Sequence, residues 1–168
     1  MKLIQIPAAD AARLVPLLQE LHALHATQHP ARYPADPTDG ALTTWLCDWL
    51  AQDSMHALAA ESPNGTLLGY LIYEMQRRPA LPVLHPEYRA MLHHIAVASD
   101  WRRMGVGRFL IKAMKTRALA DGATGIATTY APFNHASAAL MQSMGLEPVI
   151  ITAEWRAPTQ AEDAAGLP

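Results

Sequence analysis

The spacing of hydrophobic residues changes several times along the chain, and each change delimits a predicted element. Short apolar runs that are β-branched or alternate with polar residues predict strands, whereas apolar residues three or four positions apart predict amphipathic helices. The predicted strands are 3–6, 55–61, 67–76, 91–98, 123–131 and 149–156. The predicted helices are about 10–25, 39–52, 103–121 and 134–144.

Polar and proline-containing segments separate these elements. Asp10 is a candidate cap for the first helix, and Thr38 or Asp39 for the second, because their side-chain oxygens can accept hydrogen bonds from the free N–H groups of a helix start. The Ser-Pro-Asn-Gly turn that ends at Gly65 predicts a hairpin between two strands. Residues 29–40 and 77–90 contain several prolines and are predicted to be loops.

The order of the elements favours an α/β (α+β) fold with a mixed sheet. A hairpin pairs its strands antiparallel, whereas a strand–helix–strand crossover within one sheet pairs them parallel. A chain of 168 residues with 51% hydrophobic residues can bury one sizeable core. We therefore expect a single domain over residues 1–157, followed by a disordered tail at 158–168.

Residues 91–110 join a strand to the start of a helix through a turn that contains Gly105 and Gly107. The free N–H groups and the dipole of a helix start attract anions, and glycine allows a phosphate to approach the backbone closely. Arg102, Arg103 and Arg108 add positive charge at the same place. The segment therefore predicts a binding site for a phosphate or pyrophosphate.

The residues around the two glycines exclude two common phosphate motifs. A P-loop has Lys and then Ser or Thr after its second glycine, whereas Gly107 is followed by Arg108 and Phe109. A dinucleotide fingerprint has a third glycine where this chain has Leu110. The remaining pattern, Arg102-x-x-Gly105-x-Gly107, resembles the acetyl-CoA signature of the GCN5-related N-acetyltransferase (GNAT) superfamily.

A second segment, residues 134–148, resembles the Asn-x-x-Ala-x-x-Leu-Tyr-x-x-x-Gly-Phe helix of the same family. Met141 occupies the position of the Tyr that family members often use as general acid. The resemblance implies a mostly antiparallel mixed sheet with splayed central strands, flanked by about four helices, and acetyl-CoA as co-substrate without a metal. The cofactor-binding residues that it implies are Ile95, Ala96, Val97, Arg102, Arg103, Met104, Gly105, Val106, Gly107, Arg108, Asn134 and Ser137.

The implied reaction is direct transfer of an acetyl group from the thioester to a neutral amine, which requires removal of a proton. The resemblance places a base at His93, two residues before Ile95, and an imidazole pKa of about 6.5 suits that role. A packed or substrate-shaping His93 is the alternative, and strand alternation predicts that His94 points to the opposite face. Glu74 is a second candidate base, and Tyr130 is a candidate substitute for the missing acid.

The expected function is N-acetylation of a primary amine on a small molecule, with a protein amine as a less favoured acceptor. The loops 29–40 and 77–90 are predicted to line the acceptor site. The alternative function is a GNAT-like module that binds acyl-CoA and turns it over weakly or not at all, since Met141 cannot donate a proton. Turnover with a panel of amines distinguishes the two.

Charge and composition narrow the partners and the compartment. A net charge of −2 gives no general reason to expect binding to nucleic acid or to an anionic membrane. The single cysteine, Cys47, fits a reducing compartment, and without a secretory signal we expect a cytoplasmic protein. His22, His25 and His29 have helical spacing, but with Pro30 next to them and no acidic ligand nearby a metal site is disfavoured. A homodimer is compatible with the family resemblance.

Overall fold

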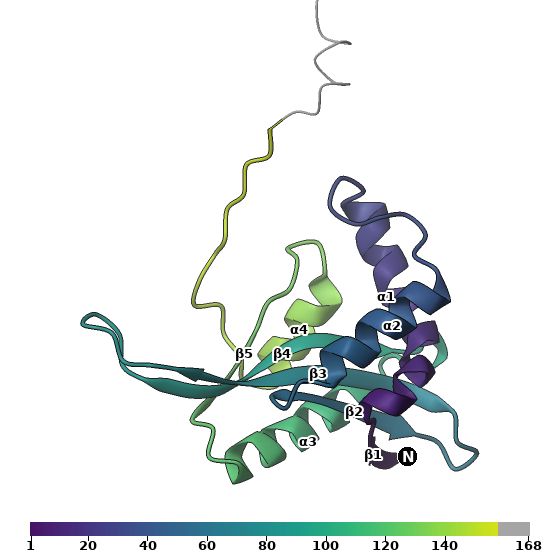
Figure 1. Cartoon of the computed structure of the whole chain (residues 1–168), viewed down its shortest axis with the longest axis horizontal. Helices are drawn as coiled ribbons and strands as arrows, with labels where there is room; N and C mark the ends of the chain where they lie inside the picture. The colour runs from purple at the N-terminus through teal and green to yellow at the C-terminus, as the bar shows by residue number, and fades with distance from the viewer. Residues whose placement is uncertain (158–168) are drawn as a thin grey trace, which may run out of the picture.

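The computed structural model describes residues 1–157, which form one five-stranded sheet with helices on both of its faces (Figure 1). The strands are β1 (Lys2–Gln5), β2 (Met55–Glu61), β3 (Leu67–Arg78), β4 (Glu87–Val97) and β5 (Gly125–Thr128). They lie in the order β1-β2-β3-β4-β5, antiparallel except for the parallel pair β4–β5. The predicted mixed, mostly antiparallel α/β fold is therefore confirmed.

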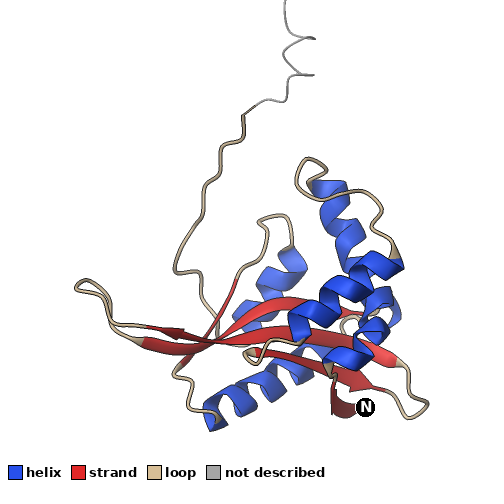
Figure 2. Ribbon diagram, viewed as in Figure 1, coloured by secondary structure: helices blue, strands red, loops and turns tan. Residues whose placement is uncertain are grey.

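Four α-helices and two short 3-10 segments complete the fold (Figure 2). They are η1 (Ala8–Leu14), α1 (Val15–Gln28), α2 (Asp39–Leu50), η2 (Ser99–Trp101), α3 (Val106–Ala120) and α4 (His135–Ser143). Because side chains alternate along a strand, neighbouring residues of β2 serve two separate cores. Ala57 and Ala59 pack with η1, α1 and α2, whereas Leu58 and Ala60 pack with α3 and α4.

Of the predicted helix caps, Thr38 is a cap in the structure and Asp10 is not. Thr38 caps α2, since its hydroxyl oxygen accepts a hydrogen bond from Ala41 N–H at 3.2 Å. Asp10 does not cap a helix; it lies inside η1, which begins directly after Pro7. The segment buries Ala11 and Leu14, so the apolar spacing predicts the residues that face the core. The segment is, however, a 3-10 helix and not the predicted α-helix. Pro16 falls in the first turn of α1, where a missing N–H costs nothing.

The β3–β4 hairpin is longer than the sequence predicts. Residues 77–90 were predicted to be a loop, but β3 continues to Arg78 and β4 begins at Glu87. Cross-strand contacts stabilise this extension: Arg77 lies 3.9 Å from the centre of the Tyr88 ring, and Arg78 forms an ion pair with Glu87 at 3.6 Å. The prolines are confined to the tip, where they interrupt no ladder.

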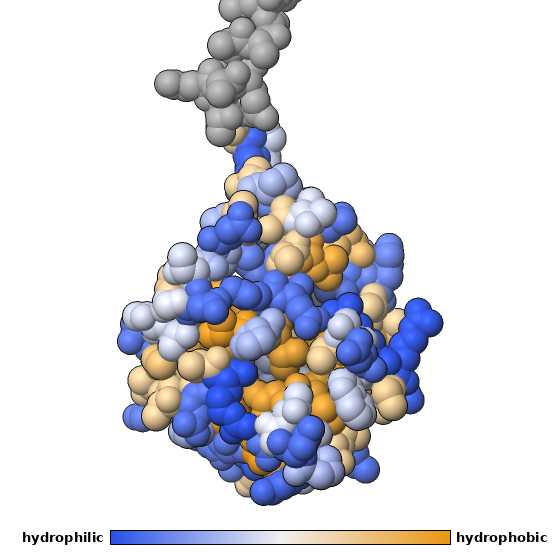
Figure 3. Space-filling view, turned by 90° about the vertical axis from the view of Figure 1, so that its right-hand side faces the viewer, coloured by the Kyte–Doolittle hydropathy of each residue, from blue (hydrophilic) through white to orange (hydrophobic). Residues whose placement is uncertain are grey.

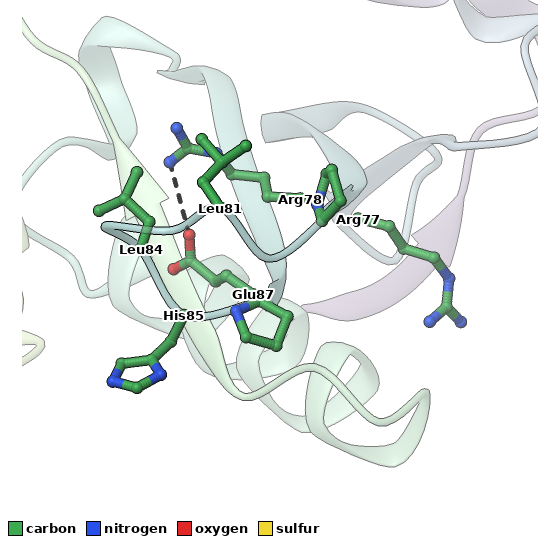
Figure 4. A pocket seen from close by; sticks show the side chains of 8 residues that line it. Arg77, Arg78, Leu81, Leu84, His85 and Glu87 are labelled. Carbon is green, nitrogen blue, oxygen red and sulfur yellow. Dashed lines mark ion pairs between the residues drawn. The ribbon is translucent and has the colours of Figure 1, made fainter.

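A shallow hollow of about 450 Å³ lies at the tip of this hairpin (Figure 4). Leu81, Leu84 and His85 line it, together with the Arg78–Glu87 ion pair. Glu87 is the first residue of β4, whereas the glycine-containing turn follows the last residue, Val97. The hollow is therefore at the opposite end of β4 from the predicted phosphate site.

The prediction of a final strand at 149–156 is wrong. The segment leaves the body of the protein as an extended chain (Figure 1), and Val149, Ile150 and Ile151 are 89%, 83% and 92% exposed. Arg32 forms an ion pair with Glu154 at 2.8 Å, which ties the segment to the loop after α1. β-branched residues favour an extended backbone, but a strand also needs an adjacent edge to pair with. Within residues 1–157 this segment pairs with none.

Hydrophobic and hydrophilic residues are mixed on the surface of the protein. Seen from the right-hand side of Figure 1, apolar residues lie at the surface between hydrophilic ones (Figure 3). Over the described range, no helix combines the length and the apolar content needed to cross a bilayer. The predicted tail at 158–168 lies outside the described residues.

Candidate functional site

β5 pairs with only part of β4, and this leaves one side of β4 open. The parallel register runs from Arg89↔Gly125 to Leu92↔Thr128, where the Thr128 hydroxyl also donates a hydrogen bond to Leu92 O at 3.0 Å. Beyond this point the chain turns toward α4, while β4 continues to Val97. In the described structure, the β5-facing edge of 93–97 therefore pairs with no strand. β4 and β5 thus diverge as the resemblance predicts, although β5 is the edge strand of the described sheet rather than a central one.

An irregularity in β4 occurs at the start of this open stretch. Ile72 is opposite His94 and Tyr73 is opposite Leu92, so His93 has no partner in the ladder. This extra residue is a β-bulge, which changes the direction of a side chain and is common near active sites. The rings of His93 and His94 lie 5.4 Å and 5.2 Å from the ring of Trp49 on α2. The prediction that they point to opposite faces is wrong, because the bulge interrupts the alternation.

His93 and Glu74, the two candidate bases, are in direct contact. His93 Nε2 lies 3.0 Å from Glu74 Oε2. A hydrogen bond from Gln76 Nε2, together with the His93 contact, holds the pKa of the Glu74 carboxyl below its usual value, so Glu74 is ionised at neutral pH. An ionised carboxylate can only accept, so the hydrogen must be on His93 Nε2. In neutral His93, Nδ1 therefore carries the free lone pair.

Aromatic rings of α2 cover the other side of the two histidines. Trp45 and Trp49 are stacked with their centroids 5.0 Å apart, and Trp45 also lies 5.7 Å from His94. Burial lowers the pKa of His94 to about 4, so its ring is neutral at physiological pH. Trp45 is 44% exposed and His93 retains part of its surface, so solvent reaches this cluster. We call Trp45, Trp49, His93 and His94 the aromatic wall.

The turn that leads into α3 has the geometry of an anion site. Arg103 and Gly105 both have positive φ, at 62° and 85°, and α3 begins at Val106 without a side-chain cap. The first helical hydrogen bond runs from Phe109 N–H to Gly105 O. The N–H groups of the first turn therefore have no intrahelical acceptor and remain available to an anion.

The residues of the Arg102-x-x-Gly105-x-Gly107 pattern have different structural roles. The backbone at position 105 is left-handed, a conformation that glycine adopts without strain. A Cβ at Gly107 would lie 2.9 Å from Leu140 Cδ2, so glycine at this position allows α4 to pack closely on α3. Arg102 Nε donates to Val97 O at 3.1 Å and its Nη2 to Glu20 at 3.3 Å, which joins the turn to β4 and α1. These contacts hold the Arg102 guanidinium at the end of β4.

Comparisons with known proteins agree with this geometry. The model of the acetyltransferase (GNAT) family matches residues 18–146. The chain belongs to the GNAT acetyltransferase family. The expected acyltransferase class is therefore confirmed, and acetyl-CoA as its co-substrate follows from the family.

Solved structures show the same fold at low sequence identity. A mutant of the BH1408 protein from Bacillus halodurans superposes with a TM-score of 0.82 at 16% identity, covering 94% of this chain and 100% of that one. The aminoglycoside N-acetyltransferase AAC(6')-Iy in complex with CoA gives 0.72 at 20%, covering 94% and 95%. The aminoglycoside acetyltransferase meta-AAC0020 from an uncultured soil metagenomic sample, in complex with sisomicin, gives 0.69 at 16%, covering 94% and 96%. No functionally curated protein matches this acetyltransferase.

The remaining predicted residues of this GNAT acetyltransferase lie on and before α4. Asn134 caps α4, since its Oδ1 accepts a hydrogen bond from Ser137 N–H at 3.0 Å. Met141 is 2% exposed and packs in the core beneath α3, and Tyr130 is partly buried against the same core. The cofactor-binding role of Asn134 and Ser137 and the acid role of Tyr130 stay predictions.

Two features of the site were not visible in the sequence. The helical spacing of Trp45 and Trp49 predicts core residues and gives no sign that Trp45 is exposed beside His94. His22 and His25 lie on α1 and His29 directly follows it, and within the described part of the chain no group of three or more His, Cys, Asp or Glu side chains has an arrangement that could hold a metal ion. His25 and His29 instead pack against Phe133, the residue before Asn134.

Proposed function

We propose that the protein transfers the acetyl group of acetyl-CoA to a primary amine of a small molecule by direct attack in a ternary complex. The observation that carries this proposal is the contact between Glu74 of β3 and His93, the bulged residue of β4, near the point where β5 departs. In this proposal His93 is the proton acceptor and acts next to the open edge of 93–97. A thioester aligned along that edge would lie beside it.

The co-substrate would bind along β4 and over the start of α3. Backbone groups of Ile95, Ala96 and Val97 would pair with the pantetheine amides as an added strand does, with the Val97 carbonyl also accepting from Arg102 Nε. The first-turn N–H groups of α3 would bind the pyrophosphate, with Arg103 and Arg108 exposed nearby. Arg102 would position the end of β4 through its contact with Val97 O, rather than bind phosphate.

The chemistry follows from the state of the pair. A lysine-like amine has a pKa of about 10.4 and is mostly protonated at neutral pH, so it must lose a proton before it attacks. His93 Nδ1 would accept this proton, directly or through one water, while the ionised Glu74 fixes the ring and stabilises the imidazolium that forms. The amine nitrogen bonds to the carbonyl carbon, the C–S bond breaks, and CoA leaves as a thiolate.

The thiolate needs no strong acid to leave. A thiol pKa of about 8.5 makes the thiolate a good leaving group, so a missing acid does not abolish turnover. Met141 occupies the family's acid position and is buried, so protonation of the thiolate would come from solvent or from Tyr130. Tyr130 is only partly buried, which is compatible with that role.

A small-molecule acceptor is supported by two of the similar structures. The meta-AAC0020 structure is a complex with sisomicin, and an AAC(6')-Iy structure is a complex with the bisubstrate analogue CoA-S-monomethyl-acetylneamine, so these related folds accommodate small amines. The alternative is a module that binds acyl-CoA but turns it over weakly or not at all. Released CoA thiol, measured with a panel of primary amines after calorimetry has established acetyl-CoA binding, distinguishes them. Binding without turnover above the rate in the absence of enzyme would contradict the proposal.

We also propose that the protein forms a homodimer through the segment 149–152. Its three β-branched apolar residues are exposed, and among residues 1–157 no strand lies on the outer edge of β5. One chain thus contains both an unpaired strand-forming segment and an open edge, yet the two are not paired with each other. Reciprocal pairing between two copies would satisfy both, because a two-fold interface is self-complementary.

A further inference from the structure

The aromatic wall lies directly beside the proposed proton acceptor. His93 contacts Glu74 through Nε2 on one side and the ring of Trp49 on the other. Trp49 is stacked on Trp45, with an interplanar angle of 26°, and Trp45 is the more exposed of the two. A flat apolar surface therefore extends away from the point at which the amine would react.

Such a surface suits a particular kind of acceptor. Indole rings bind planar apolar groups by offset or edge-to-face stacking, and they also attract a cation placed over the ring face. The wall itself carries little charge, since His94 is neutral and both indoles are uncharged. It therefore offers contact area to the body of an acceptor and no carboxylate for additional ammonium groups.

The charges next to the wall also limit the acceptor. On this part of β3 and β4, Arg89 donates hydrogen bonds to Gln76 Oε1 at 3.2 Å, and Gln76 Nε2 donates to Glu74 at 2.8 Å. Glu74 has no ion pair with Lys or Arg among the described residues and contacts only His93 and Gln76. One carboxylate is thus available to an ammonium group, whereas a second ammonium group of a polycation would be repelled by the nearby Arg89 guanidinium. The electrostatics favour an acceptor with a single amine.

We propose that the acceptor is a monoamine whose ammonium group is attached to a planar, apolar body, and that Trp45 determines this specificity. This inference rests on the N-acetyltransferase function proposed above. Glu74 and His93 would take the amine, while the body would lie against the exposed face of Trp45. Trp45 touches neither reacting atom, so it acts on the affinity for the acceptor rather than on the chemistry.

The experiment compares four acceptors: tryptamine, 2-phenylethylamine, n-butylamine and the polycationic neamine. Steady-state CoA release is measured for the wild type and for Trp45→Ala, Trp45→Phe and Leu119→Ala. Leu119 is 60% exposed on α3, on the opposite face of the sheet, so Leu119→Ala is a matched truncation outside the site. Calorimetric titration of 2-phenylethylamine into the protein–CoA complex gives a readout that does not depend on turnover.

We expect the two aromatic amines to have the highest kcat/KM. Trp45→Ala should raise their KM about tenfold, leave kcat within about twofold, and change n-butylamine little. Trp45→Phe should restore most of the affinity, and Leu119→Ala should change nothing. Turnover that favours neamine or n-butylamine, or an equal effect of Trp45→Ala on all amines, would overturn the inference but leave the N-acetyltransferase function standing. Absence of turnover with every amine would contradict the function, and calorimetry would then decide whether the aromatic wall binds an aromatic amine.

Discussion

His93 Nε2 lies 3.0 Å from Glu74 Oε2, and this contact joins two neighbouring strands at the bulge of β4. The carboxylate accepts the Nε2 hydrogen and leaves Nδ1 as the basic nitrogen. His93→Ala should therefore lower kcat by about a hundredfold at pH 7, because general-base catalysis commonly contributes that much. Acetyl-CoA affinity should change little, since the proton acceptor does not bind the pyrophosphate.

Released CoA thiol and calorimetry give the two readouts for this variant. His85→Ala is the control, because His85 lies in the hairpin loop at the other end of β4. Full activity of His93→Ala would show that His93 only shapes the site. Partial rescue by added imidazole would support proton transfer rather than packing.

Glu74→Gln should separate orientation from basicity. The amide keeps the size of the side chain but offers either a donor or a weaker acceptor to His93, so the tautomer is no longer fixed. We expect kcat to fall about tenfold, less than for His93→Ala, with the pH dependence of kcat shifted. If Glu74 were the base itself, the order of the two effects would be reversed. Measuring kcat against pH for both variants decides between these assignments.

His94 should make the protein less stable in mild acid. Its folded-state pKa is lowered from 6.5 to about 4, so between these values the unfolded chain binds a proton that the native ring does not. Stability is therefore complete above pH 6.5 and falls toward pH 4, by about 3 kcal/mol for this group. His94→Phe should remove this part of the pH dependence.

Urea unfolding at pH 7 and pH 4.5 measures the effect of His94. The wild type should lose more unfolding free energy between these values than His94→Phe does. Burial also lowers the pKa values of His25 and His56, and both residues are present in both proteins. Equal losses would show that His94 is protonated in the native state.

Gly105 and Gly65 provide a matched test of the phosphate site. Both have positive φ, at 85° and 86°, and a Cβ would meet nothing within 4 Å at either position. Substitution by Glu therefore imposes similar backbone strain and the same charge. Only Gly105→Glu places a carboxylate at the start of α3, and it should weaken acetyl-CoA binding at least a hundredfold.

Gly65→Glu is the control for Gly105→Glu, because both substitutions strain the backbone to a similar extent. Thermal unfolding should show a similar fall in Tm for Gly105→Glu and Gly65→Glu, while calorimetry shows lost affinity only for the first. Wild-type affinity in a folded Gly105→Glu protein would mean that the turn into α3 does not bind the pyrophosphate.

Much of this architecture could be predicted from the sequence, because the local signals agree with the tertiary structure. β2 has the predicted limits of 55–61, and Thr38 caps α2 as its position predicts. The glycine pattern before α3 led to the family that the family model confirms. In each case the residues that determine the local structure all lie within one short segment of the chain.

The errors arose where two distant segments decide the outcome. Nothing local marks His93 as the extra residue of a bulge, since this depends on the register with β3. The pairing of Arg77 with Tyr88 extends a hairpin through a segment whose prolines predict a loop. Conversely, 149–156 has the composition of a strand but finds no edge within the described residues. Strand propensity alone cannot supply that partner.

The exposed segment 149–152 yields the last prediction. If two copies pair their segments with the open β5 edges, light scattering should give about twice the 18.3 kDa of one chain. Ile150→Lys places a charge among the paired residues and should convert the dimer to the monomer. Leu119→Lys adds the same charge to the exposed face of α3 and should leave the dimer intact. A wild-type protein that remains monomeric at micromolar concentration would contradict the proposed interface.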